Sequence, residues 1–321
     1  MIDIALFQAF VCVFIILGYW KVYLRYENRA PPPSRYSYVA GGEVRGNDSN
    51  SSEIRLLSYN IQWLPHMKKD VNELLRHIKP YDIVCLQECF TGVYNSKQAR
   101  LECLAKFGGY SIVTCGGPAM QSSKLLDSGL VICSRYPVIE SRFVPFMQSC
   151  RVDQYANKGI LYAKLDAPGG HLHIYNTHLQ ASYEEEYAIH PVRWSQIKQF
   201  VNEVPLQSND AMAVCGDFNV DINMEHNKDT MRHFFQNMCA MNMYIPPAVS
   251  TNWARYTLDG NIQHSSSTVH DPHYVPQVLD YFFAKNMRVV GVDVHRCGSF
   301  SDHLAVELIA SSRQGSSPHS C

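Results

Sequence analysis

Polar side chains follow or interrupt six apolar segments of the sequence, and these side chains could do acid–base and metal chemistry. A strand that ends in such a group places it at the edge of a sheet, where a site can form. Taken singly, a carboxylate after a strand is usually solvated, and GDFN at 216–219 could be a tight turn. Together, at separate strand ends, they are hard to explain as turns. The residues concerned are Asn60, Glu88, His178, Asp217, Asn219, Asp280, Asp302 and His303.

The donor types in this set favour one kind of chemistry. Carboxylate and amide oxygens without a thiolate suit Mg²⁺ or Mn²⁺ better than zinc. Two histidines, with an aspartate for orientation, supply general acid–base capacity. Such a combination can cleave a phosphoester, because the metal neutralises a phosphate oxygen while a base takes a proton from water. The sequence contains neither G-x-x-x-x-G-K-[ST] nor G-x-S-x-G, so a P-loop NTPase and a serine hydrolase are not supported.

Apolar segments of strand length alternate with amphipathic segments along residues 54–310. The segment 67–79 predicts a helix, because Leu74, Leu75 and Ile78 fall on one face. Many strands with few helices favour sheets that pack on each other and are covered by helices, in an α/β or α+β fold. Further helices are predicted at 190–204 and 228–240, and strands at 54–60, 82–88, 129–134, 160–165, 171–179, 211–216, 278–284 and 304–309.

The composition excludes several classes of protein. The chain has 321 residues, of which 46% are hydrophobic and 18% charged, and its net charge is −1. Intrinsic disorder over most of the chain is excluded, because it needs low hydrophobicity and high net charge. No nucleic-acid partner is expected, since phosphate neutralisation needs a basic face. The 11 cysteines form no CxxC pair, which argues against a zinc site or a disulfide scaffold and favours a reducing compartment.

Residues 1–26 predict an N-terminal transmembrane helix that anchors the chain in a membrane. The apolar run at 4–20 reaches the length of a membrane span when it is extended to Leu24. Basic residues follow it, so the positive-inside rule makes the chain a single-pass protein with its catalytic domain in the cytosol. The alternative is a cleaved signal peptide, but no basic residue precedes the run. The basic stretch 21–35 could also attract anionic lipids.

The rest of the chain divides into three predicted parts. Residues 27–53 are expected to be a flexible linker, because they combine a proline run, a pair of glycines and a small polar stretch. Residues 54–310 carry all the motifs above and are expected to form one catalytic domain. Residues 311–321 are rich in serine and are expected to form a disordered tail.

Six motifs occur in a fixed order between Ile54 and Leu308: LSYNIQWLP, CLQE, NTHLQ, GDFN, LDY and SDH. In this order they resemble the endonuclease/exonuclease/phosphatase superfamily of metal-dependent phosphodiesterases. GDFN or SDH alone would be a weak signal, whereas six ordered motifs are a strong one. The resemblance implies an α/β fold, a four-layer sandwich in which two packed mixed sheets are flanked by helices. It also implies that the site lies at one end of the sheets.

Within the superfamily, the sequence is most similar to the neutral sphingomyelinase branch. DQYANKG at 153–159 resembles that branch's D-x-x-x-x-K-G segment, and NTHLQA at 176–181 extends NTH as sphingomyelinases do. The loop 250–263, which precedes PQVLDYFF, is similar to their substrate-side loop. The resemblance implies hydrolysis of sphingomyelin, a membrane phospholipid, to ceramide and phosphocholine. A nuclease or an inositol-phospholipid phosphatase of the same superfamily is the alternative, and an inactive membrane-tethered binding module is a third possibility.

The resemblance implies a Mg²⁺ site and a charged pair beside it. Glu88 would be the principal Mg²⁺ ligand, and Asn60 and Asp302 would complete the metal-binding set, with Mn²⁺ as a possible substitute. Lys158, paired with Asp153, would add positive charge as the pentavalent state forms. For this pair the alternative is an exposed ion pair of little energetic consequence.

The resemblance also implies roles for the remaining members of the set. His303 would be the general base that activates water, and Asp280 would orient it. Asp217 and Asn219 would position the attacking water and stabilise charge on the phosphoryl oxygens. His178 would donate a hydrogen bond to a nonbridging oxygen. All of these residues are therefore expected to converge at one end of the sheets.

Overall fold

The computed structural model describes all eight strand segments that the sequence predicts. Every described residue belongs to one compact unit, Tyr36–Cys321. Among these residues no helix is long and apolar enough to cross a membrane. The membrane anchor predicted at 1–26 lies outside the described residues, as does the helix predicted at 228–240. The described residues are 36–39, 53–91, 97–115, 124–181, 186–204, 208–220, 243–244, 278–295, 297 and 300–312.

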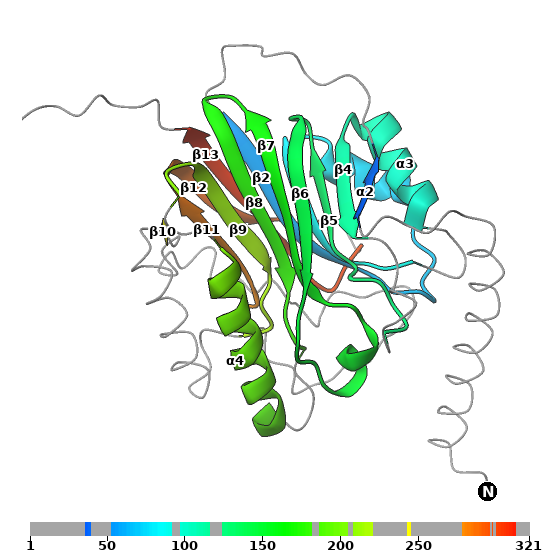
Figure 1. Ribbon diagram of the computed structural model, residues 1–321. Helices are drawn as coiled ribbons and strands as arrows, with labels where there is room; N and C mark the ends of the chain where they lie inside the picture. The colour runs from blue at the N-terminus through cyan, green and yellow to red at the C-terminus, as the bar shows by residue number, and fades with distance from the viewer. Residues whose placement is uncertain are drawn as a thin grey trace, which may run out of the picture. The chain divides into compact units, whose positions relative to one another are not determined.

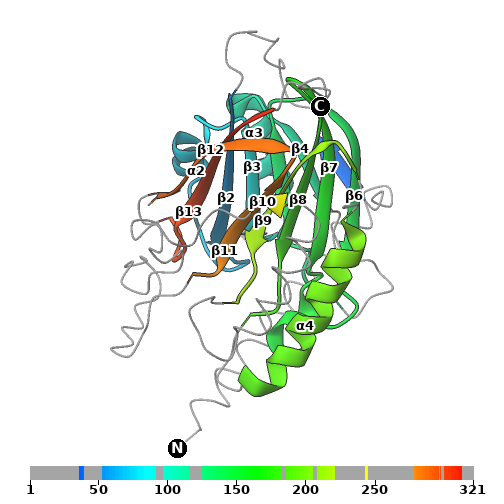
Figure 2. The same ribbon diagram turned by 90° about the vertical axis from the view of Figure 1, so that its left-hand side faces the viewer.

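The described strands form two mixed sheets (Figures 1 and 2). The seven-stranded sheet has the order β1-β4-β5-β3-β2-β13-β12, and the six-stranded sheet has the order β10-β11-β9-β8-β7-β6. The pairs β2/β3 and β8/β9 are parallel, and the other pairs are antiparallel. The strands of the first sheet are β1 (Tyr36–Val39), β2 (Glu53–Trp63), β3 (Ile83–Cys89), β4 (Ser111–Cys115), β5 (Val131–Ser134), β12 (Met287–His295) and β13 (Ala305–Ser312). Those of the second are β6 (Val138–Pro145), β7 (Gly159–Ala167), β8 (Gly170–His178), β9 (Ala211–Asp217), β10 (Met243–Tyr244) and β11 (Asp280–Lys285).

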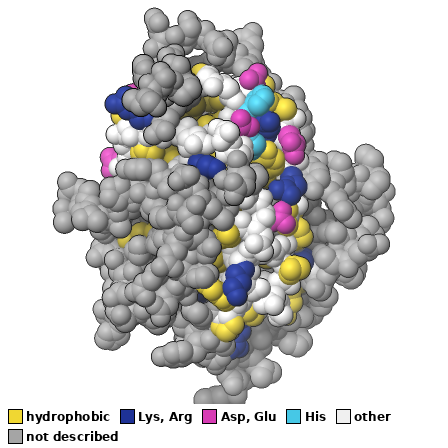
Figure 3. Space-filling view, turned by 60° about the vertical axis from the view of Figure 1, so that its left-hand side comes forward, with side chains coloured by type: hydrophobic (Ala, Val, Ile, Leu, Met, Phe, Trp, Pro, Cys, Tyr) yellow, Lys and Arg dark blue, Asp and Glu magenta, His cyan; other side chains and the backbone are white. Residues whose placement is uncertain are grey.

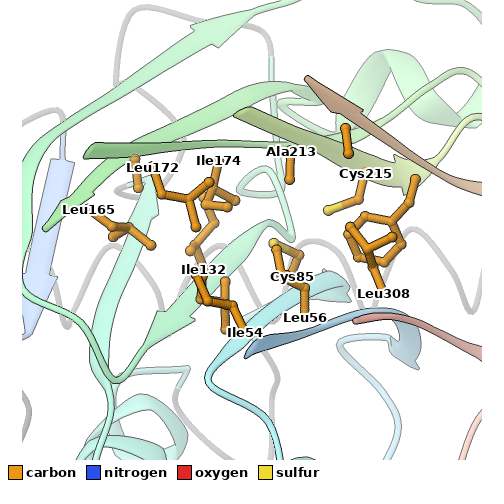
Figure 4. Close-up of a cluster of buried hydrophobic side chains, with 14 of the residues drawn as sticks. Ile54, Leu56, Cys85, Ile132, Leu165, Leu172, Ile174, Ala213, Cys215 and Leu308 are labelled. Atoms are coloured by element: carbon orange, nitrogen blue, oxygen red, sulfur yellow. The ribbon is translucent and has the colours of Figure 1, made fainter. Parts of the chain in front are cut away.

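The main hydrophobic core lies between the two sheets (Figure 4). Leu172 and Ala213 of the six-stranded sheet face Leu56 and Cys85 of the seven-stranded sheet across this core. Because side chains alternate along a strand, Leu57, the neighbour of Leu56, belongs instead to the core on the outer face of its sheet. Both faces of the central strands are therefore buried, which accounts for their nearly continuous apolar sequences.

Helices cover the outer faces of both sheets. The first sheet is covered by α2 (Val71–Ile78) and α3 (Lys97–Gly108), whose leucines pack against the outer face of β2 and β3. The second is covered by α4 (Glu186–Glu203), which contributes Ile197 and Phe200 to a third core. The structure thus confirms two packed mixed sheets with helices outside them, as the sequence predicts.

The helix predicted at 67–79 is shorter in the structure, because Asp70 caps α2: its carboxylate accepts a hydrogen bond from the backbone N–H of Asn72 at 2.9 Å. The strands β1, β4, β6, β10 and β12 and the helix α3 were not predicted. The strand β1 falls within the range 27–53 that the sequence predicts as a linker, and it forms an edge of the first sheet by pairing with β4. This part of the predicted linker is therefore a strand.

The strand directions bring one end of both sheets to the polar motifs. The parallel strands β8 and β9 both finish at the lower end of the molecule in Figure 1. β11 is antiparallel to β9, and β13 is antiparallel to β2, so each of them begins where its neighbour ends. As a result, groups near the C-terminal ends of β2, β3, β8 and β9 meet a group at the start of β11 and groups just before β13.

Candidate active site

Neighbouring strands of the second sheet place three site residues side by side. Asp217, the last residue of β9, pairs in register with His178 on one side and with Asp280 on the other. In the first sheet, Asn60 lies opposite Gln87, directly before Glu88. Residues at paired positions project to the same face of a sheet, so His178, Asp217 and Asp280 converge although they are far apart in the sequence.

Three residues at the strand ends have left-handed backbone conformations. The φ angles are 55° at Glu88, 50° at Asn219 and 44° at Gln62. This conformation costs a non-glycine residue about 1–2 kcal/mol, and such costs concentrate at functional sites. The positive φ values break the regular alternation of side chains and turn these three groups out of the direction that a continuing strand would give them.

The side chain of Asn60 connects the two sheets by hydrogen bonds. Its Nδ2 lies 3.0 Å from Glu88 Oε1, 3.0 Å from Asp217 Oδ2 and 3.4 Å from His303 Nε2. The backbone N–H of Gln62 donates to Asn60 Oδ1 at 3.0 Å, which fixes the orientation of the amide. An amide group carries two hydrogens, so Asn60 satisfies the two carboxylates first and cannot also donate a full bond to the imidazole.

His303 is held by carboxylates on both of its ring nitrogens. Nδ1 lies 2.9 Å from Asp280 Oδ2, and Nε2 lies 3.7 Å from Asp217 Oδ2. The hydroxyl of Ser301 accepts a hydrogen bond from the backbone N–H of His303 at 3.1 Å and donates to the carbonyl of Asn60 at 2.5 Å. Burial by itself would lower the pKa of His303, but the carboxylates, Asp280 above all, raise it well above its usual value.

Lys158 and Asp153 form a buried pair, not the exposed pair that was the alternative expectation. Lys158 Nζ donates to Asp153 Oδ2 at 2.8 Å, and both side chains are buried. The same ammonium lies 3.1 Å from His178 Nε2. Burial, reinforced by the positive charge of Lys158, holds the pKa of His178 well below its usual value, so this imidazole is neutral. Because an ammonium only donates, Nε2 accepts and the proton of His178 resides on Nδ1.

This arrangement affects the role predicted for His178. Nδ1 is buried and has no hydrogen-bond partner among the described residues, whereas Nε2 is engaged with Lys158. Donation from Nε2 to a phosphate oxygen therefore requires Lys158 to move away from the imidazole. While Lys158 donates to Nε2, the proton of His178 is on Nδ1, so only Nδ1 can donate a hydrogen bond.

Asn219 and Asp217 are linked through their own turn. The backbone N–H of Asn219 donates to Asp217 Oδ1 at 2.9 Å, and Asn219 Nδ2 donates to the carbonyl of Leu179 at 3.2 Å. Lys158 Nζ donates to the same carbonyl at 3.0 Å. Burial raises the pKa of Asp217 to about 7, and the neighbouring charge of Asp280 adds to the increase.

Gln62 and Lys69 support the site and were not predicted from the sequence. Gln62 Nε2 donates to Asp302 Oδ2 at 2.6 Å. Lys69 Nζ donates to the carbonyls of Ile61 and Phe300 at 2.8 and 2.5 Å, and so ties the end of β2 to the loop before Asp302. Burial lowers the pKa of Lys69 to about 8. The sequence carried a signal for Gln62 alone, because it lies within the motif NIQWLP.

The donor set fits a hard divalent cation. Among the residues that the structure describes, two groups of side chains could hold a metal ion: Glu88 with His178 and Asp217, and Asp217 with Asp280 and His303. Burial raises the pKa of Glu88, as it does that of Asp217, which means that their charged forms are disfavoured without a compensating charge; a bound cation would supply that charge and stabilise the deprotonated carboxylates. Oxygen donors dominate, and the described site contains no thiolate. Of the three predicted metal ligands, Glu88 belongs to one of these groups.

The other two predicted ligands, Asn60 and Asp302, differ in their contacts. Asn60 contacts the Glu88 carboxylate directly through its amide nitrogen. Asp302 belongs to neither of the two groups, and its carboxylate accepts from Gln62. The amide oxygen Oε1 of Gln62 is buried and has no hydrogen-bond partner among the described residues, so it is an additional acceptor near Asp302.

The chain is similar to several known proteins. A sphingomyelinase of Dictyostelium discoideum is 28% identical over 172 residues, which cover 44% of this chain and 37% of that protein, so the chain spans well under half of that relative. Sphingomyelinase C of Bacillus cereus is 26% identical over 252 residues, which cover 72% of each chain. A crystal structure of a Staphylococcus aureus beta toxin variant with bound magnesium ions has the same fold, with a TM-score of 0.59 and 23% identity over 81% of this chain and 100% of that one.

The family is shown by a sequence model that spans most of the chain. It matches residues 57–303, a range that begins in β2 and ends at His303. All the site residues described above lie within this range. The fold, the site at the end of the two sheets and this match agree. The chain belongs to the endonuclease/exonuclease/phosphatase family of hydrolases.

Proposed function

We propose that this protein is a Mg²⁺-dependent phosphodiesterase of the sphingomyelinase type, which hydrolyses sphingomyelin to ceramide and phosphocholine. The observation that carries the proposal is the convergence of Asn60, Glu88, Asp217, Asp280 and His303 at one end of both sheets. Relatives named sphingomyelinase C and phospholipase C, at 26% and 23% identity, support the lipid substrate.

His303 is the group that takes a proton from water in this proposal. The hydrogen bond between its Nδ1 and Asp280 orients the ring so that Nε2 faces Asp217. The negative charge of Asp280 makes the imidazole a stronger base and stabilises the imidazolium that forms. A bound divalent cation, held by Glu88 with Asn60 and Asp302 nearby, would neutralise charge on a phosphate oxygen.

Lys158 supplies a second positive charge beside the reacting group. Its ammonium lies between Asp153 and His178, and it is buried with both. A charge in a site that excludes water interacts more strongly with a developing phosphoryl charge than an exposed one does. Asp153 also accepts a hydrogen bond from the backbone N–H of Ala181 at 2.7 Å, so its carboxylate keeps a partner when Lys158 moves.

The proposed function includes the membrane. Residues 1–26 would anchor the chain as a single-pass protein, with the catalytic domain on the cytosolic side, and the basic stretch 21–35 would attract anionic lipids. The net charge of −1 and the mixture of acidic and basic side chains on the face in Figure 3 support a lipid substrate over a nucleic acid.

A panel of headgroups tests the proposal. The full chain, reconstituted with vesicles of sphingomyelin, phosphatidylcholine, phosphatidylethanolamine or an inositol phospholipid, is assayed for released headgroup with Mg²⁺ and with a chelator. We expect release of phosphocholine from sphingomyelin that depends on Mg²⁺ and is lost in His303→Ala. Absence of release from wild-type protein would remove the proposal. Faster cleavage of a single-stranded or abasic oligonucleotide than of any lipid would favour the nuclease alternative.

A further inference from the structure

One short segment at the catalytic end of the molecule exposes three large apolar side chains. The segment joins β6 to β7 and contains the 3₁₀ helix η1 (Arg151–Tyr155), which Figure 1 shows at the end where β8 finishes. Met147 is 84% exposed, Val152 67% and Tyr155 44%. The other exposed large apolar side chains among the described residues, Phe107, Ile139 and Val290, lie on three separate elements. Single exposed apolar residues are ordinary, whereas a group of them marks an interaction surface.

The exposed charge within this segment is positive. Asp153 is the one acidic residue between β6 and β7, and it is buried against Lys158. Arg151, at the start of η1, is exposed. The exposed face of this segment therefore combines apolar side chains with a basic one and presents no carboxylate.

The same surface is hollowed. A cavity of about 600 Å³ is lined by Met147 and Tyr155 together with Lys124, Phe146 and Val192. Lys124 Nζ donates to Ser149 Oγ at 2.7 Å, which places a second basic group at this hollow. Ligand sites usually have volumes of about 300–1,000 Å³, and the volume of this hollow falls in that range. The hollow can therefore receive part of a lipid headgroup or chain.

The exposed side chains are carried on a firmly held backbone. The Gln199 side chain accepts a hydrogen bond from the backbone N–H of Met147 at 3.0 Å, and Gln196 donates to the carbonyl of Gln148 at 2.8 Å. On the other side, the carbonyl of Tyr155 accepts from Leu125 and Leu126 at 2.7 and 2.9 Å. The exposure of the apolar side chains is thus a property of an ordered scaffold.

We propose that the Met147–Tyr155 segment is a docking surface for a phospholipid bilayer. Met147, Val152 and Tyr155 enter the interfacial layer, and Arg151 and Lys124 face anionic headgroups. Three side chains are far too few for a stable protein dimer, which buries about 800 Å² on each partner. They suffice for interfacial binding, in which a few apolar groups and basic charges act together. This inference rests on the proposed function, because docking here brings the site to a substrate that lies in the bilayer.

A tryptophan placed in the segment tests docking without reference to activity. The full chain carrying Val152→Trp is bound to phosphatidylcholine vesicles that contain brominated lipids, with and without phosphatidylserine. We expect additional quenching relative to wild type, and more of it when phosphatidylserine is present. Ile139→Trp is the matched control, because Ile139 is 52% exposed near the opposite end of β6. Quenching that is equal at the two positions, or absent at 152, would overturn the proposal.

A kinetic comparison separates docking from chemistry. Met147→Ser and Val152→Ser should each lower hydrolysis of vesicle-borne sphingomyelin by about tenfold, since each removes one apolar side chain from the interface. Hydrolysis of a water-soluble short-chain analogue should stay unchanged, as should both activities in Ile139→Ser. Equal losses on both substrates would overturn the proposal, as would a dimer that Met147→Ser dissociates. If wild type hydrolyses no lipid but the tryptophan at 152 is quenched, the proposed function fails and docking stands.

Discussion

Asp280 and His303 are 23 residues apart in the sequence and lie at the ends of different sheets, yet their side chains form a buried hydrogen bond of 2.9 Å between Oδ2 and Nδ1. Asp280 opens β11 in the second sheet, and His303 precedes β13 in the first. The bond therefore also joins the two sheets at the end where the site lies. Within the site, the carboxylate determines both the orientation and the basicity of the imidazole.

Asp280→Asn should lower the rate of phosphodiester hydrolysis by about a hundredfold or more, the scale of lost general-base catalysis. The amide keeps the shape of the side chain but removes the charge that raises the pKa of His303, so this pKa should fall toward its usual value. NMR titration of the imidazole and the pH profile of kcat would measure both effects. Asp293→Asn, on β12, is the matched control and should leave both unchanged. Full activity in Asp280→Asn would refute the role.

Gln62→Ala should lower the affinity for a divalent cation by about 10- to 100-fold. This is the range observed when a group that orients a metal ligand is removed. Gln62 holds Asp302 through its Nε2 and Asn60 through its backbone N–H, and the substitution removes the first contact while keeping the second. Calorimetric titration with Mg²⁺ would measure the affinity. Gln98→Ala, on the exposed face of α3, should leave the affinity as in wild type. An equal affinity in Gln62→Ala would show that Asp302 needs no such support.

The contribution of Asp217 to the stability of the metal-free protein should fall as the pH rises from weakly acidic to neutral values. The pKa of Asp217 is about 7 in the folded protein against 3.8 ordinarily, so its contribution is complete below 3.8 and is lost as the pH rises through about 7. A divalent cation needs the deprotonated carboxylate, so Mg²⁺ should stabilise the protein more at about pH 8 than at about pH 5. Thermal unfolding with and without Mg²⁺ would measure this difference.

Asp217→Asn supplies the control for that experiment, because the amide does not titrate. Both the fall in stability with pH and the pH dependence of the Mg²⁺ effect should become smaller in this variant. Burial raises the pKa of Glu88 as well, so part of the dependence should remain. A pH dependence of stability that is the same in Asp217→Asn as in wild type would contradict the raised pKa of Asp217.

The sequence predicts buried strands better than half-exposed ones, because only a buried strand has a continuous apolar sequence. β3, with the sequence IVCLQEC, is buried along nearly its whole length, and its apolar run was visible in the sequence. The edge strands β6 and β12 are half exposed and mix charged with apolar residues, so no apolar run marks them. In α3, Lys97 and Arg100 are buried, which hides the amphipathic pattern.

The site shows the same contrast between local and distant information. The spacing of Asp153 and Lys158 suggested a pair, but its burial depends on the fold around it. The contact between Gln62 and Asp302 spans 240 residues, so no local pattern can disclose it. Sequence motifs therefore indicated which side chains do the chemistry, whereas the residues that hold them in place required the structure.

Lys158→Met should destabilise the protein by about 3–5 kcal/mol, the cost of leaving one member of a buried ion pair without its partner. The backbone N–H of Ala181 still donates to Asp153 in this variant, but it carries no full positive charge to replace the ammonium. The pair Arg142–Glu203 offers a matched control: its atoms are 2.9 Å apart, but both side chains are partly exposed, so Arg142→Met should cost less than about 1 kcal/mol.

Chemical unfolding of the two single variants and of Lys158→Met combined with Asp153→Leu would complete the comparison. The double variant should be less destabilised than the sum of its parts, because it leaves no buried charge uncompensated. Additive losses would show that Lys158 and Asp153 do not interact as a pair. Hydrolysis should be lost in every variant that lacks Lys158, whatever its stability.

Gly216→Ala should prevent the site from forming, because the backbone at this position leaves no room for a side chain. Gly216 has φ +142° and pairs with Thr177, and a Cβ atom there would lie 2.0 Å from the Thr177 carbonyl oxygen. Backbone atoms on a central strand cannot move aside cheaply, so β8 and β9 would have to separate beside Asp217. We expect a loss of more than about 3 kcal/mol in the free energy of unfolding, or no folded protein. Gly291→Ala is the matched control, because no atom lies within 4 Å of its Cβ position, and it should fold with wild-type stability and activity.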